Sequence, residues 1–186
     1  MFRLFLKLYW KLSGWKLSGK FPYQYKKIVL AVAPHTHWVD VFVGFATRNE
    51  MQINHAKFLG KKELFKGPLG WILKALGGTP VDRFSKHGMV DQVAALFTAK
   101  DNFILGLSPE GTRKRVNTLR TGFYFIAKNA GVPIVPIGFD FENKKVIIGD
   151  AFFAGDNEAE DFKKIIAFYS KIKGKVPNFD LRHLKI

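Results

Sequence analysis

The hydrophobic positions of the chain fall into short runs that alternate with longer amphipathic stretches. Six short runs rich in Val, Ile, Leu and Phe, bounded by glycine, proline or polar residues, predict strands. They cover residues 26–34, 53–61, 79–83, 103–109, 132–141 and 144–150. The stretches between them carry apolar residues at helical spacing and predict helices. These are residues 40–50, 65–78, 88–102, 121–131 and 156–174.

This alternation predicts the fold class α/β, in a single domain with a largely parallel or mixed sheet and helices on both faces. The chain has 186 residues, which is enough for one domain with its own core, and no proline-, glycine- or serine-rich linker divides it. No apolar run approaches the roughly 20 residues that span a bilayer. We therefore expect one domain at residues 21–186, preceded by an amphipathic segment at residues 1–20.

The N-terminal segment is basic and aromatic. The first 39 residues contain seven Lys or Arg and no acid, and Arg3, Lys7 and Lys11 recur every four residues, as one stripe on a helix. Aromatic and leucine side chains fill most of the remaining circumference. This pattern predicts a helix that lies in a membrane interface, with cations at the lipid phosphates. A helix that packs on the core or at a dimer contact is the alternative, because amphipathicity fits both.

The composition limits the classes of binding partner and of chemistry that are open to the protein. A net charge of +15 predicts attraction to an anionic partner: nucleic acid, an anionic lipid surface or a phosphorylated substrate. The absence of cysteine excludes disulfides, a thiolate nucleophile and Cys-ligated zinc. We expect a cytoplasmic protein that binds the membrane peripherally.

Three polar clusters lie at the ends of predicted strands: "PHTHWVD", "GGTPVDR" and "SPEGTRKR". In open α/β sheets, ligands bind at the carboxyl ends of the strands, so one cleft can hold all three clusters. In the first cluster, His35 and Asp40 are about 140° apart on a continuous helix and cannot meet there. They meet only if His35 lies in the turn before a helix and Asp40 in its first turns. An Asp that holds one imidazole nitrogen leaves the other free to take a proton from a hydroxyl.

Two other interpretations of the first cluster remain open. His35, His37 and Asp40 are candidate metal ligands, but they need further ligands, and the remaining histidines do not form ligand-like pairs. Alternatively, His35 is a hydrogen-bonded strand-end residue and Asp40 an N-cap. We prefer the proton-transfer pair and expect no metal.

The third cluster is cationic, which predicts that it binds a phosphate group of the substrate. Arg113 follows directly after Pro-Glu-Gly-Thr, and its guanidinium is suited to phosphate oxygens. Gly111 permits close approach of a ligand to the backbone. Arg83 ends its own strand and supplies a second cation to the same phosphate. Glu110 either orients the substrate or holds the loop by a salt bridge.

Together these motifs resemble those of the glycerolipid acyltransferase family, of the 1-acylglycerol-3-phosphate acyltransferase (PlsC) type. "HTHWVD" fits the first family motif, His-x4-Asp, although the family often has Asn and Ser where this chain has Pro34 and His37. "GGTPVDR" resembles the second motif, "PEGTR" matches the third at every position, and "VPIVPIG" is similar to the fourth. The four occur in family order between Pro34 and Ile137, over most of the domain.

The resemblance implies a reaction and a set of site residues. His35, oriented by Asp40, would deprotonate the hydroxyl of a lysophospholipid, most readily 1-acylglycerol-3-phosphate, which then attacks the thioester of acyl-CoA or acyl-carrier protein. The implied substrate-binding residues are Arg83, Glu110, Gly111, Thr112 and Arg113. No cofactor is implied beyond the acyl donor, and the implied partners are the lysophospholipid, the donor and an anionic membrane surface.

Other functions stay open at this point. One alternative is that the acyl acceptor is another lysolipid, such as a lyso-aminolipid. A nucleic-acid-binding protein would explain the charge, but the basic residues are scattered without a binding motif, so we expect no nucleic-acid partner. A metallohydrolase and a non-catalytic lipid-binding protein are the remaining alternatives.

Overall fold

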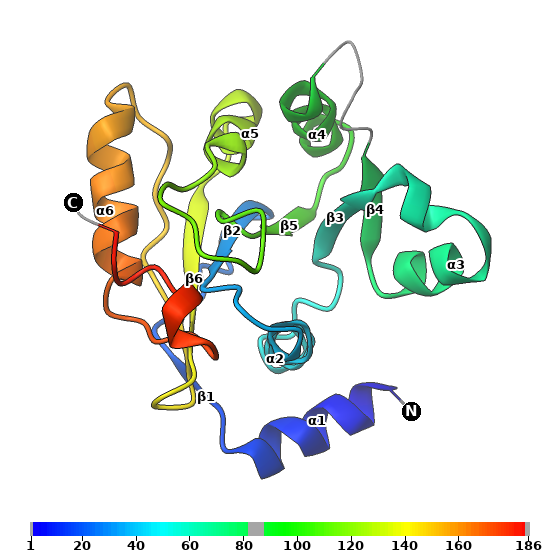
Figure 1. Cartoon of the computed structure of the whole chain (residues 1–186). Coiled ribbons are helices and arrows are strands. Elements are labelled where there is room, and N and C mark those ends of the chain that lie inside the picture. The colour runs from blue at the N-terminus through cyan, green and yellow to red at the C-terminus, as the bar shows by residue number, and fades with distance from the viewer. Residues whose placement is uncertain (1, 82–87, 185–186) are drawn as a thin grey trace.

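The six predicted strands and one further strand form a mixed seven-stranded sheet, which helices flank (Figure 1). The computed structural model describes residues 2–81 and 88–184. The strands are β1 (Lys16–Ser18), β2 (Lys27–Ala33), β3 (Lys57–Lys61), β4 (Gly78–Val81), β5 (Phe103–Leu107), β6 (Ile134–Asp140) and β7 (Lys145–Ile148). The helices are α1 (Phe2–Ser13), α2 (Val39–Glu50), α3 (Gly67–Ala75), α4 (Met89–Thr98), α5 (Gly122–Ala130) and α6 (Glu158–Tyr169), with short 3-10 turns at Lys62–Phe65 and Pro177–Phe179.

The strand order is β1-β7-β6-β2-β5-β3-β4. The block from β6 to β4 is parallel, β7 pairs with β6 in the antiparallel sense, and β1 pairs in parallel with β7. The fold-class prediction is therefore confirmed. Because β2 lies between β6 and β5 and the three strands are parallel, the loops that follow them lie side by side at the carboxyl ends of the strands.

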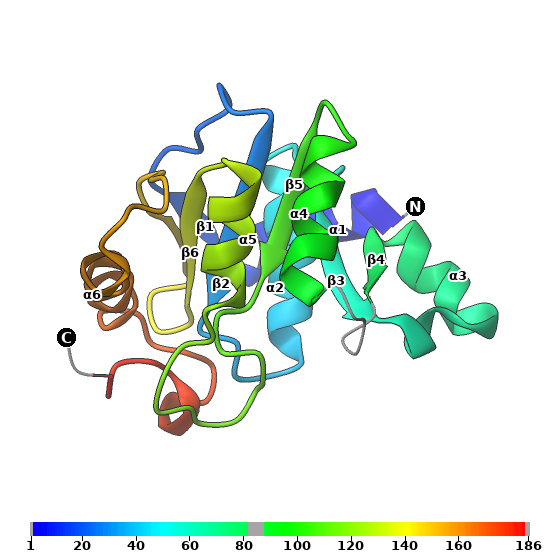
Figure 2. The same cartoon turned by 90° about the horizontal axis from the view of Figure 1, so that it is seen from above.

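The central strand explains how the two layers form. Ile28 and Leu30 of β2 join one apolar cluster, whereas the alternate residues Val29, Ala31 and Ala33 join another on the opposite face. Helices α4, α5 and α6 cover the second face, and α2 covers the first (Figures 1 and 2). This arrangement follows from the two-residue period of a strand that is buried on both sides.

The N-terminal segment is partly integrated into the domain. Leu6 and Trp10 of α1 are buried in the same cluster as Val43 and Ala46 of α2, and α1 lies along the outer side of α2 (Figure 1). The strand β1, which the hydrophobic pattern does not reveal, then joins the sheet edge. One side of α1 thus packs on the core, as the alternative interpretation of this helix requires, and its other side remains exposed.

Several predicted boundaries were wrong. The strand expected at residues 53–61 begins only at Lys57, because Ile53 donates its N–H to the Arg48 carbonyl and residues 51–56 form the turn after α2. The helix expected to extend to residue 174 ends at Tyr169, where the tail turns back toward the sheet. Within residues 2–81 and 88–184, no helix combines the length and apolar character needed to cross a bilayer.

Candidate active site

A tight loop at the carboxyl end of β2 carries the residues of the first motif. His35 lies in this loop, α2 begins at Val39, and Asp40 lies in the first turn of that helix. Asp40 is 1% exposed, and its Oδ2 atom accepts the backbone N–H groups of Thr36 and His37, each at 2.7 Å. The same Oδ2 atom lies 3.3 Å from Nδ1 of His35. The loop therefore wraps around one buried carboxylate, which brings His35 and Asp40 together.

The second ring nitrogen of His35 faces outward. Nε of Arg113 donates a hydrogen bond to His35 Nε2 at 3.2 Å. Nε2 is therefore the acceptor, and the hydrogen-bond network assigns the ring proton to Nδ1, beside Asp40. The His35 side chain is 24% exposed, so a substrate can reach it. A neutral imidazole in this orientation is arranged to accept a proton from a hydroxyl group.

Glu110 supports the loop from the interior. It is 1% exposed, and its Oε2 atom accepts the N–H of His35 at 2.7 Å and the hydroxyl of Ser108 at 3.1 Å. Burial raises the pKa of Glu110 to about 7 in spite of these hydrogen bonds, and the charges of Asp40 and Asp180 add to the increase. Of the two roles expected from the sequence, the geometry therefore favours holding the loop over contact with substrate, although the bond is to a backbone N–H and is not a salt bridge.

The rest of the third motif forms an exposed turn. Gly111 has a φ of 65°, in the left-handed region that favours glycine. Its N–H donates to the carbonyl of Ser108 at 3.1 Å. The hydroxyl oxygen of Thr112 accepts the N–H of Lys114 at 3.3 Å. The turn folds back so that Arg113 reaches His35, whereas the observed contacts of Gly111 and Thr112 shape the turn itself.

Comparison with known proteins agrees with this geometry. The family model described as Acyltransferase matches residues 16–140, which contain the His35 loop and the turn that carries Arg113. The chain belongs to the acyltransferase family. The family prediction from the motifs is therefore confirmed.

Curated acyltransferases match most of this chain. It is 32% identical over 141 residues to a 1-acyl-sn-glycerol-3-phosphate acyltransferase of Streptococcus pneumoniae, covering 73% of this chain and 51% of that protein. It is 30% identical over 151 residues to the protein of the same name from Haemophilus influenzae, covering 77% of this chain and 61% of that protein. The chain thus spans about half to three fifths of the length of these relatives.

A solved structure has the same fold. The crystal structure of the 1-acyl-sn-glycerophosphate (LPA) acyltransferase PlsC from Thermotoga maritima matches with a TM-score of 0.59 and 20% identity. The match covers 89% of this chain and 74% of the other. At this identity the likeness concerns the fold alone.

Arg83 and the metal alternative are the remaining predictions for this site. Arg83 lies outside the described residues. For the metal alternative, Nδ1 of His37 accepts the N–H of Val39 at 3.3 Å and is occupied by the local backbone. In the described part of the chain, no group of three or more His, Cys, Asp or Glu is placed to hold a metal ion. The geometry therefore gives no support to a metal site at His35, His37 and Asp40.

The sequence did not reveal two long-range hydrogen bonds, one to the His35 loop and one to the strand β2 that precedes it. The hydroxyl oxygen of Thr36 accepts the N–H of Val176 at 3.1 Å, and the hydroxyl of the buried Tyr169 donates to the carbonyl of Ala31. Burial raises the pKa of Tyr169 well above its ordinary value, so this hydroxyl remains a donor. Local spacing has no signal for these contacts, because the partners are more than 130 positions apart.

Proposed function

We propose that the protein transfers an acyl chain from an acyl thioester to the free hydroxyl of a lysophospholipid, most readily 1-acylglycerol-3-phosphate, in phospholipid biosynthesis. One observation carries the proposal: Nδ1 of His35 is held 3.3 Å from a buried carboxylate while Nε2 is presented as an acceptor beside a cation. The names of the curated relatives support the choice of acceptor.

The proposed chemistry needs one base and no covalent enzyme intermediate. His35 Nε2 accepts the proton of the acceptor hydroxyl while that oxygen attacks the thioester carbonyl. The imidazolium that forms is stabilised by Asp40, whose carboxylate is already fixed by two backbone N–H groups. Collapse of the tetrahedral intermediate breaks the C–S bond, and His35 returns the proton to the thiolate. The products are the ester and a free thiol, so the acyl donor is the only co-substrate required.

Arg113 changes partner in this scheme. In the structure its Nε atom covers Nε2 of His35, which is the position that the acceptor hydroxyl must reach. A guanidinium forms two parallel hydrogen bonds with a phosphate, and these are stronger than its single hydrogen bond with a neutral imidazole. We therefore assign the acceptor phosphate to Arg113, with Arg83 as the expected second cation, so that phosphate binding uncovers the base.

The enzyme has to reach an acceptor that resides in a membrane, and α1 is suited to such contact. Its outward side combines a basic stripe with an exposed apolar stripe. These are Arg3, Lys7 and Lys11, and Leu4, Leu8 and Leu12. A helix of this kind lies at the interface, with its cations at anionic headgroups.

A second exposed apolar group belongs to α3. Trp71 is 83% exposed, Leu69 and Ile72 are more than half exposed, and the exposed Lys66 and Lys74 flank them. Tryptophan with neighbouring lysines is typical of side chains at the level of lipid headgroups. The exposed side chains of α1 and α3 both support the proposal that the protein binds peripherally to an anionic membrane surface on the cytoplasmic side.

The decisive experiment is acyl transfer by the purified protein in lipid vesicles. Labelled acyl-CoA and acyl-carrier protein are offered to 1-acylglycerol-3-phosphate and to a panel of other lysolipids, including lyso-aminolipids. We expect product from the wild type and a loss of about 10²–10⁴-fold in His35→Ala, the range that a general base contributes.

Two controls accompany this assay. His55→Ala changes an exposed histidine on the turn after α2 and is expected to keep full activity. Wild-type activity is also expected to persist with chelator. The absence of turnover with every acceptor, or equal rates for His35→Ala and the wild type, would refute the proposed mechanism.

A further inference from the structure

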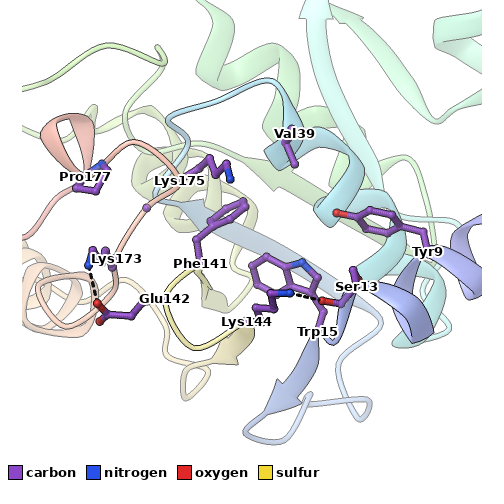
Figure 3. Close-up of a pocket in the computed structure, with 11 residues that line it drawn as sticks. Tyr9, Ser13, Trp15, Val39, Phe141, Glu142, Lys144, Lys173, Lys175 and Pro177 are labelled. Carbon is purple, nitrogen blue, oxygen red and sulfur yellow. Dashed lines mark hydrogen bonds and ion pairs between the residues drawn. The ribbon is translucent and has the colours of Figure 1, made fainter.

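A pocket of about 390 Å³ opens at the carboxyl end of β6 (Figure 3). In the strand order, β6 lies on one side of β2, which leads to His35, and β5, which precedes Arg113, lies on the other. It is formed by segments that are far apart in sequence: the end of α1 with the residues after it, the first residue of α2, the β6–β7 turn and the tail after α6. The described lining residues are Tyr9, Ser13, Trp15, Val39, Phe141, Glu142, Lys144, Lys173, Gly174, Lys175 and Pro177.

One wall of this pocket also holds the His35 loop. Gly174 packs so closely that a Cβ atom there would lie 3.0 Å from Thr36 and 3.2 Å from Pro34. Two residues later, the N–H of Val176 donates to the hydroxyl oxygen of Thr36. The pocket therefore lies directly behind the residues that flank His35.

The sheet order separates this pocket from the proposed acceptor site. The strand β2, which leads to His35, has β5 on one side and β6 on the other. The turn with Arg113 follows β5, whereas Phe141 and Glu142 follow β6. A transfer reaction brings two substrates to one base. If the acceptor phosphate binds on the β5 side, the β6 side remains for the donor.

The pocket is cationic. Lys144, Lys173 and Lys175 line it, and Glu142 is the one carboxylate among its described lining residues. Glu142 is paired with Lys173. The ammonium of Lys144 donates to the carbonyl of Ser13 at 2.9 Å, which leaves its charge without a neighbouring carboxylate among these residues. The lining therefore has three cations and one anion, which suits a ligand with more than one phosphate.

Three aromatic residues, Tyr9, Trp15 and Phe141, also line the pocket. Phe141 contacts the buried Trp15 edge to face, with ring centroids 4.9 Å apart, and Lys175 lies over the Phe141 ring with its Nζ atom 5.8 Å from the centroid. Figure 3 shows Phe141 and Lys175 side by side at the centre of the lining. Aromatic surface next to lysines fits a nucleobase that is linked to phosphates.

We propose that this pocket binds the phosphorylated nucleotide end of the acyl-CoA donor, an adenosine bearing 3′- and 5′-phosphates, while the extended pantetheine arm delivers the thioester to His35. This inference rests on the proposed acyl transfer. The volume is at the lower end of the roughly 300–1,000 Å³ of small-molecule sites, so it admits the nucleotide end and leaves the acyl chain outside.

The first test measures binding without catalysis. Adenosine 3′,5′-bisphosphate is titrated into the wild type, Lys175→Glu and Lys144→Gln by calorimetry. We expect binding to the wild type and affinities reduced about tenfold or more in both variants. Lys171→Glu is the matched control, because this exposed lysine lies on the same tail outside the lining. Equal affinities in all four proteins, or no binding to any, would overturn the proposal.

The second test uses steady-state kinetics and separates this inference from the proposed function. Lys175→Glu is expected to raise the KM for acyl-CoA about tenfold and to leave the KM for the lysophospholipid unchanged. Acyl-pantetheine, which lacks the nucleotide, should react equally with both proteins. An active enzyme whose KM for acyl-CoA is indifferent to Lys175→Glu, or which accepts acyl-carrier protein but not acyl-CoA, refutes the donor pocket and leaves acyl transfer intact. If no donor is used at all, the proposed function fails, whereas the bisphosphate titration still decides what the pocket binds.

Discussion

At the scale of single residues, Glu110 shows how a residue in a binding motif can act through another. Its Oε2 atom accepts the N–H of His35, and its Oε1 atom is buried without a hydrogen-bond partner among the described residues. A buried carboxyl group without a partner for one oxygen is better accommodated with a proton. This agrees with the increase of its pKa to about 7, whose largest cause is burial.

The raised pKa of Glu110 predicts a pH-dependent stability. Between pH 4.5 and about 7 the folded protein keeps a proton that the unfolded chain has released, so this contribution is present at low pH and is lost as the pH rises through 7. Glu110→Gln is neutral throughout. We expect its free energy of unfolding, measured with urea from pH 5 to pH 8, to increase relative to that of the wild type as the pH rises. Parallel profiles would show that Glu110 is ionised in the folded state.

At the scale of elements, α1 has two different apolar sides. Leu6 and Trp10 are buried against α2, whereas Leu8 and Leu12 are more than half exposed, at 55% and 75%. The hydrophobic pattern alone marks all four as apolar positions of one helix. Only the packing of α1 separates those that stabilise the fold from those that remain available to a membrane.

This division predicts the outcome of substitutions on α1. The double variant Leu8→Ser/Leu12→Ser removes apolar side chains from the exposed side, so we expect weaker binding to anionic vesicles, by about tenfold or more, with unchanged thermal stability. Vesicle flotation at low and high salt measures the binding. Leu17→Ser, on the partly exposed strand β1, is the control and should bind as the wild type does. Full vesicle binding by the double variant would remove α1 from the membrane contact.

At the scale of the whole molecule, the sheet places two cationic regions on either side of one base. Arg113 follows β5 and contacts His35, and Lys175 lies in the tail that packs behind the loop and contacts Phe141. The high net charge of the chain therefore has two assigned uses in the proposed mechanism, acceptor phosphate and donor nucleotide. A third is the basic side of α1.

Separate sites predict independent effects. Arg113→Gln should raise the KM for the lysophospholipid about tenfold or more, and Lys175→Glu should raise that for acyl-CoA. Because the two side chains contact different partners, the loss of kcat/KM in the double variant should equal the product of the single losses. Steady-state kinetics with each substrate varied in turn provides the measurement. A double variant no worse than Arg113→Gln alone would place both residues at one ligand.

The order of strands and helices, the family and the pairing of His35 with Asp40 followed from the sequence by itself. The elements depend on short-range periodicity, and the His35–Asp40 pair depends on two residues five positions apart. The family follows from the resemblance of four ordered motifs between Pro34 and Ile137. The burial of Glu110, the two sides of α1, the edge strand β1 and the pocket behind His35 were decided by the tertiary structure alone. Each arises where segments distant in the chain meet, as when the tail at Gly174 packs against Pro34 and Thr36. Such contacts depend on the closure of the whole sheet and leave no periodic trace in the sequence.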